Sequence, residues 1–167
     1  MTRRLLLACA LVAVASCDDG RRDEAVLIAL SQVRALHHQA DVLLAAGDAD
    51  TAIAAVARAL EVPFPPGAPE AEDVRLDARA RLGKLYLGRG RPADARRIAD
   101  EGIAAARRES FFLANLLQVS AEVHEAEARR AADPAAARRE HEAAILEYER
   151  SVHIAERIQQ RLVKEGR

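Results

Sequence analysis

RLGKLYLGRGRPADARRIADEGIAAA, residues 81–106, is the stretch that decides how this chain folds. The segment GRGRP at 88–92 separates two runs in which small and aliphatic residues recur every three or four positions. Glycine is favoured just past the end of one helix and proline at the first position of the next. The stretch therefore predicts a helical hairpin, with helices over residues 70–88 and 92–107.

One further hairpin is predicted on each side of this one. Their helices are expected over residues 23–46, 49–62, 110–132 and 134–164. The prolines in PFPPGAP, residues 63–69, end the second of these helices because proline has no amide donor and clashes with the preceding turn. Asp133 is placed to cap the last helix, with Pro134 at its first position.

The composition predicts helix throughout. Half of the residues are apolar, but alanine dominates that share, aromatic residues make up 3% and tryptophan is absent. Alanine has the highest helix propensity, whereas the β-branched and aromatic residues that favour strands are sparse here. We expect an all-α fold of three antiparallel helical hairpins.

Apolar stripes indicate which helix faces are buried. The stripe of the first helix is Val26, Leu30, Val33, His37, Ala40 and Leu44. The stripe of the last helix is Ile145, Tyr148, Val152, Ala155, Ile158 and Leu162.

The second helices of the hairpins are similar to one another. Their sequences are GDADTAIAAVARALEVP, GRPADARRIADEGIAAA and, more weakly, EHEAAILEYERSVHIA. This self-similarity resembles the tetratricopeptide repeat. The family's leucine, glycine, tyrosine and turn glycine are matched by Leu82, Gly83, Tyr86 and Gly90, and its small contact residues by Ala52, Ala59, Ala95 and Gly102. The spacing departs from the family, since Ala52, Ala95 and Ala144 lie 43 and 49 residues apart instead of about 34.

The resemblance implies that the hairpins stack as a short α-solenoid whose first helices line a groove for a peptide or a partner helix. By register, this partner-binding groove would display Arg34, His37, Asp41, Leu44, Asp77, Lys84, Leu87, Asn115, Gln118 and Glu122. These side chains make a polar surface of mixed charge. A compact six-helix bundle is the alternative arrangement, and these residues would then be solvated helix faces.

The amino terminus, MTRRLLLACALVAVASC, has a basic head, an apolar run and a small-residue cleavage site. Val14-Ala15-Ser16-Cys17 resembles the lipobox of bacterial lipoproteins, which implies cleavage before Cys17 and lipidation of its sulfur. We therefore expect a signal peptide at 1–16, a lipidated cysteine with a flexible tether at 17–22, and a helical domain at 23–165. The apolar run is too short for a transmembrane helix, and an ordinary secretory signal is the other alternative.

Lipidation at Cys17 would hold the protein on the periplasmic or extracellular face of a bacterial cell membrane. Asp18 resembles the signal that retains enteric lipoproteins in the inner membrane. Without the signal peptide, 23 basic and 26 acidic side chains remain, so a nucleic-acid partner is not expected.

The sequence gives no indication of catalysis. Cys9 would be lost with the signal and Cys17 would carry lipid, so no thiol remains for a nucleophile or a metal. His124-Glu125 and His141-Glu142 begin like a zinc-protease helix, but the second histidine is missing from both. We predict a protein that is not an enzyme and that needs no metal or cofactor.

Together these features favour a membrane-anchored adaptor that binds another envelope protein or peptide. The alternative is a compact helical-bundle lipoprotein with a structural role or a role in binding lipid or cell wall. An enzyme is a third hypothesis.

Overall fold

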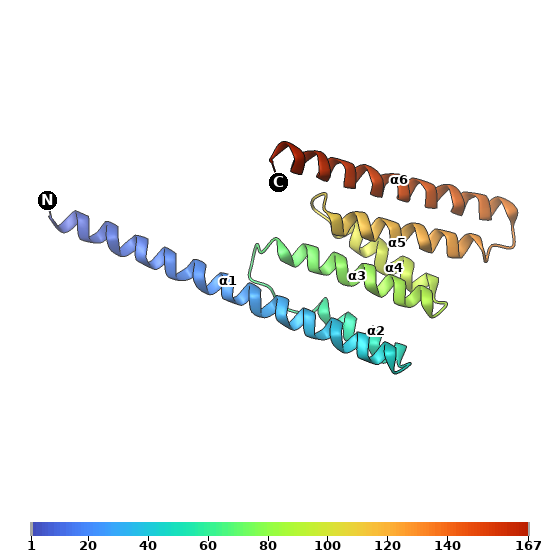
Figure 1. Ribbon diagram of the computed structural model, residues 1–167, viewed down its shortest axis with the longest axis horizontal. Coiled ribbons are helices and arrows are strands. Elements are labelled where there is room, and N and C mark those ends of the chain that lie inside the picture. The colour runs from blue at the N-terminus through green and yellow to red at the C-terminus, as the bar shows by residue number, and fades with distance from the viewer. Residues whose placement is uncertain (1, 167) are drawn as a thin grey trace.

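The computed structural model describes the backbone of residues 2–166 and the side chains of residues 20–166. This part of the chain is all-α and contains no strand, as the sequence predicts (Figure 1). Its helices are α1 (Thr2–Ala45), α2 (Ala49–Ala59), α3 (Glu70–Gly88), α4 (Pro92–Ala105), α5 (Phe111–Ala128) and α6 (Pro134–Lys164).

Glycines in the left-handed conformation end two of the helices. Gly47 follows α1 with φ of 82°, and Gly90 follows α3 with φ of 68°. Glycine adopts this conformation without the steric penalty that a Cβ atom imposes. Pro92 occupies the start of α4, so the GRGRP segment forms the predicted turn.

Side-chain caps fix the first turns of three helices. Asp48 accepts a hydrogen bond from the Thr51 amide at 3.1 Å, and Ser110 accepts one from the Leu113 amide at 3.1 Å. Asp133 accepts from two amides at the start of α6, at 3.0 and 3.1 Å. These bonds satisfy donors that have no partner within the helix, and the predicted cap at Asp133 is confirmed.

α1 includes residues 20–22, where the sequence predicts part of a flexible tether. The helix continues there because Gly20 is the only weak helix former among them, and one glycine costs a helix about 1 kcal/mol. Arg22 also donates to the carbonyl oxygen of Pro66 at 3.2 Å, which ties this segment to the chain between α2 and α3. The signal segment 1–16 and Cys17 lie outside the fully described residues.

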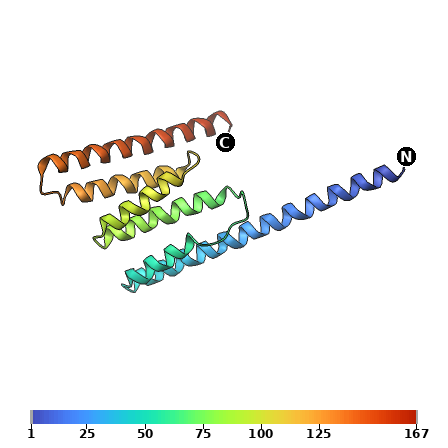
Figure 2. The same ribbon diagram turned by 180° about the vertical axis from the view of Figure 1, so that it is seen from behind.

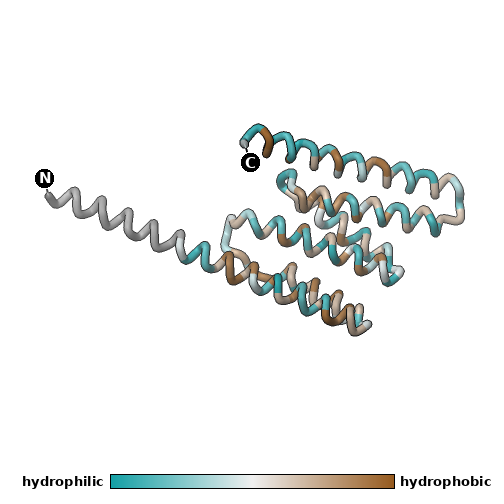
Figure 3. The backbone as a smooth tube through the Cα atoms, in the orientation of Figure 1, coloured by the Kyte–Doolittle hydropathy of each residue, from teal (hydrophilic) through white to brown (hydrophobic). Residues whose placement is uncertain are grey.

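Helices pack mainly against near neighbours in the chain. Within the described chain, α1 packs on α2, α3 on α4 and α5 on α6, and contacts between these pairs join α2 to α3, α3 to α5 and α4 to α5. The views from both sides show the pairs lying next to one another in chain order (Figures 1 and 2). Hydrophobic and hydrophilic residues alternate along the coloured part of the chain (Figure 3), and α3 packs against three other helices, α2, α4 and α5.

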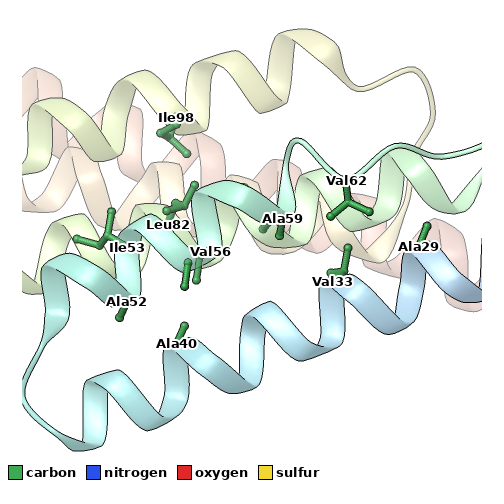
Figure 4. Packing of buried hydrophobic residues seen from close by; sticks show 12 residues of the cluster. Ala29, Val33, Ala40, Ala52, Ile53, Val56, Ala59, Val62, Leu82 and Ile98 are labelled. Atoms are coloured by element: carbon green, nitrogen blue, oxygen red, sulfur yellow. The ribbon is translucent and has the colours of Figure 1, made fainter.

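The buried apolar residues form three clusters that follow the same order. The first and largest joins α1 and α2 to α3 and to Ile98 of α4 (Figure 4). A second joins α3, α4 and α5 around Leu76, Leu116 and Val119, and a third joins α5 and α6 around Leu117. The core is therefore distributed along the molecule.

Small residues sit where helices approach most closely. A Cβ atom added at Gly83 of α3 would lie 2.5 Å from Val119 Cγ1 of α5, and one added at Gly102 of α4 would lie 2.4 Å from Leu116 Cδ2. The expected small contact residues Ala52, Ala59 and Ala95 are all buried. The prediction that these positions permit close helix packing is confirmed.

The predicted stripe of α6 is only partly correct, because Tyr148 and Ile158 are half-buried toward α5 but its other members are exposed. Ile145, Val152 and Leu162 are 56%, 53% and 43% exposed, while Ser151 and Ile154 face α5 and are buried. The reason is that α6 packs substantially against α5 alone among the described helices, so one narrow face is covered.

Candidate partner-binding face

The ten predicted groove residues lie on α1, α3 and α5. α3 packs directly on α5, and α1 is joined to α3 by an ion pair between Asp41 and Arg81. The first helices of the three pairs thus carry all ten residues. We refer to these ten residues as the partner face.

A cluster of titratable groups holds the α1 and α3 parts of the partner face together. Arg81 donates to Asp41, whose other oxygen lies 3.8 Å from Nδ1 of His38. Burial lowers the pKa of His37, and the positive charge of Arg81 lowers it further, while Asp77 and Asp41 act in the opposite direction. Asp77 and Asp41 are thus near enough to His37 to oppose the lowering of its pKa.

The other α1 and α3 residues divide into exposed charges and packed leucines. Arg34 and Lys84 are exposed. Leu44 is half-buried and packs against the first apolar cluster, and Leu87 is also half-buried. This part of the partner face therefore combines two exposed cations with the Asp41–Arg81 ion pair. Its two leucines are less exposed than the cations.

The α5 residues are turned toward α6. Gln118 donates to the hydroxyl of the buried Ser151 at 3.1 Å. Tyr148 of α6 donates to Glu125 at 3.1 Å, and burial together with this bond raises the pKa of Tyr148 to about 12. Asn115 and Glu122 are half-buried. This end of the partner face is thus partly occupied by the last helix.

A charged network that the sequence analysis did not predict joins α4, α5 and α6. Arg96 of α4 binds Glu127 of α5 and lies 3.0 Å from Glu140 of α6. His124 Nδ1 donates to the same Glu140 oxygen at 2.7 Å. These residues are separated by 16 to 44 positions, so no local pattern could reveal their contact.

His124 helps to join α5 to α4 and α6 through this network. Its Nδ1 atom lies between Glu140 and, at 3.2 Å, Arg96. Among the residues described, no group of three histidine, cysteine or acidic side chains is placed to hold a metal ion.

Two surface cavities lie at the end of the molecule where α3 begins. One, of about 300 Å³, lies between the start of α5 and the end of α6. The other, of about 680 Å³, lies between the proline segment 63–69, α3 and the loop after α4. The ten residues of the partner face line neither of them.

The chain matches no family model, no curated protein and no solved structure. Within the described residues, none of the helices has both the length and the apolar character that crossing a bilayer requires.

Proposed function

We propose that this chain is a lipid-anchored adaptor of the bacterial cell envelope, in which three stacked helical hairpins bind another envelope protein or peptide. Its role is binding and not catalysis, and it needs no cofactor. The observation that carries the proposal is the order of packing, in which three apolar clusters follow the chain from α1 to α6.

Packing of this kind is typical of repeat arrays. In a solenoid each unit contacts only its neighbours, whereas in a bundle the apolar faces converge on one centre. Here substantial contact joins helices that are adjacent in sequence or one helix apart, within the part of the chain that is described. Gly83 and Tyr86 match the tetratricopeptide pattern; Gly83 lies against Val119 of α5, and Tyr86 packs against the first apolar cluster.

The partner face suits an extended peptide or a helix that carries both charges. Arg34 and Lys84 offer exposed cations, and Asp41 offers a carboxylate that is 58% exposed although Arg81 binds one of its oxygens. A partner with acidic and basic groups at matching spacing would pair with these side chains. Such exposed pairs contribute more to partner selection than to affinity.

Anchoring raises the chance of meeting such a partner. Lipid on Cys17 would confine the domain to one membrane plane, and a partner in the same plane is then met at a raised effective concentration. The inner membrane is the site that Asp18 favours, with the helical domain on the periplasmic side.

Replacing Cys17 by serine tests the anchor. We expect the protein to move from the membrane fraction to the soluble envelope fraction. The reason is that serine lacks the sulfur atom to which the diacylglycerol would be attached. Equal retention of both forms in washed membranes would contradict the proposal.

Charge reversal tests the partner face. Crosslinking in intact cells should capture one specific partner, and Arg34→Glu and Lys84→Glu, each as a single variant, should reduce its yield strongly. Arg138→Glu provides a matched control, because Arg138 is an exposed arginine on α6. Equal loss from the control would show that the capture depends on net charge and not on this face.

A further inference from the structure

The cavity of about 680 Å³ is lined by an unusual concentration of arginine. Arg75 and Arg79 come from α3, and Arg107 and Arg108 come from the loop between α4 and α5. Arg75 and Arg79 are four residues apart and therefore lie on the same side of the helix. Glu72 is the only acidic residue among the side chains that line this cavity.

The acidic groups nearby are already engaged. Glu72 Oε1 accepts the backbone amides of Arg107 and Arg108 at 2.9 and 3.3 Å. Asp73 binds the guanidinium of Arg108 at 2.5 Å. Arg75, Arg79 and Arg107 have no carboxylate partner within 4 Å among the described residues, so the cavity has an excess of positive charge.

Arg79 is held in place with one donor unused. A Cβ atom added at Gly102 would lie 2.7 Å from Arg79 Cδ, so the arginine stem runs across the face of α4 that Gly102 leaves open. The Nε atom is buried and has no hydrogen-bond partner in the described part of the chain. Burial also lowers the pKa of Arg79, while Glu101 opposes this effect and is itself bound to Arg97 at 2.8 Å. A buried donor without a partner is costly; the Nε atom is closed to solvent, so other atoms of Arg79 line the cavity.

The rest of the cavity wall is apolar. Phe64, Pro65, Pro66 and Leu76 contribute to it, together with small alanines. The volume lies within the range of about 300–1,000 Å³ that is usual for sites that bind small molecules. The site thus combines a cationic side with an apolar side.

We propose that this cavity binds a phosphate group, with Arg75, Arg79 and Arg107 as its ligands. A phosphate monoester carries up to about two negative charges and three acceptor oxygens, and a phosphodiester carries one charge and two free oxygens; both can bind more than one guanidinium group. Guanidinium forks bind phosphate oxygens in pairs. The phosphate belongs either to a phospholipid headgroup or to a soluble phosphate. The two differ in whether apolar groups of the ligand would contact the apolar wall of the cavity.

Calorimetric titration of the full chain in non-ionic detergent tests the site. The probes are inorganic phosphate, dihexanoyl phosphatidylglycerol and, as a zwitterionic lipid, dihexanoyl phosphatidylcholine. Tighter binding of phosphatidylglycerol than of phosphate, with little binding of phosphatidylcholine, would assign the site to an anionic lipid headgroup. Equal affinity for phosphatidylglycerol and phosphate would assign it to a soluble phosphate. Absence of binding of both at millimolar concentration would overturn the proposal.

Substitutions locate the binding in this cavity. Arg75→Gln and Arg107→Gln each remove an exposed guanidinium and should weaken binding about tenfold, which is the effect of losing one charge-assisted hydrogen bond. Arg138→Gln removes the same charge from α6, outside the residues that line the cavity, and should leave binding unchanged. An equal loss from all three variants would show general charge attraction and overturn the site.

A readout without substitution guards against misfolded variants. The Nε–H resonance of Arg79 in the unmodified chain should shift as the bound probe reaches saturation, because a negative charge then lies against the same guanidinium group. An unchanged resonance at saturation would place the phosphate elsewhere. The test does not depend on lipid at Cys17, so its outcome is independent of the proposed anchoring.

Discussion

Gly83 of α3 lies directly against Val119 of α5, so that a Cβ atom at residue 83 would be 2.5 Å from Val119 Cγ1. Valine in a helix has one strongly preferred rotamer and cannot easily turn aside. We expect Gly83→Ala to lower the free energy of unfolding by about 1–3 kcal/mol, the usual effect of overpacking. Chemical denaturation of the purified chain measures it.

Gly88 provides a matched control at the end of the same helix. A Cβ atom there has no neighbour within 4 Å, and Gly88→Ala should be neutral or stabilising by up to about 1 kcal/mol. Val119→Ala in the Gly83→Ala background should restore part of the lost stability by removing the clash. Failure of this rescue would mean that the two helices do not meet at these residues.

The seam between α5 and α6 predicts opposite effects at two adjacent positions. Ser151 is 1% exposed and bonds to Gln118, whereas Val152 is 53% exposed. Ser151→Ile should destabilise the fold by about 1–3 kcal/mol through overpacking. Val152→Ser should change stability by no more than about 0.5 kcal/mol. Thermal unfolding of both variants distinguishes this register from the stripe that the sequence predicts, which would reverse the order.

Acid should weaken the network around Glu140. The hydrogen bond from His124 and the positive charge of Arg96 lower the pKa of Glu140 below its ordinary value. The remaining charged group of this network is Glu127, which binds Arg96. A carboxyl group whose pKa falls on folding stabilises the fold above its ordinary pKa, and that contribution is lost as the pH falls through the lowered value. The stability difference between the natural chain and Glu140→Gln should be largest above pH 4.5 and shrink below it.

Urea titrations between neutral and acid pH measure this difference. Glu142→Gln is a suitable control, because Glu142 is exposed and makes no ion pair within the described residues. A difference for Glu140→Gln that stays constant with pH would show that the carboxylate charge adds nothing to the network.

Hydrogen exchange should reveal a gradient along the chain. α6 packs substantially on one helix, whereas α3 contacts α2, α4 and α5. In an array whose units contact only their neighbours, the end opens more easily than the middle. Amides in the middle of α6 should therefore exchange faster than those of α3, as measured by mass spectrometry. Equal protection would favour a bundle with one cooperative core.

The sequence predicted local features well because each depends on a few neighbouring residues. Gly47 and Gly90 adopt the left-handed conformation, and Asp133 caps α6. The small residue at position 83 was also recognised from its place in the repeat pattern, and its close contact with α5 follows from the absence of a side chain. Register assigned His37 and Asp41 to one helix and Asp77 to another, and the partner face that these residues would form stays a prediction.

The rotation of α6 could not be predicted in this way. Both the stripe through Ile145 and Val152 and the face through Ser151 and Ile154 contain apolar side chains at helical spacing. Hydrophobic pattern favours the first, but close approach to α5 favours the smaller residues of the second. The balance depends on the shape of the partner helix, which a single helix does not encode.

By itself, the sequence determined that the chain is all-α, where the turns between helices lie, and which small residues lie at helix contacts. These properties follow from backbone conformation, capping and side-chain volume, all of which act over a few residues. Tertiary structure alone decided which face of α6 is buried, how Arg96 meets Glu140, and how four arginines surround one cavity. Those relationships join residues as much as 44 positions apart, and they are set by how the helices rotate as their surfaces pack.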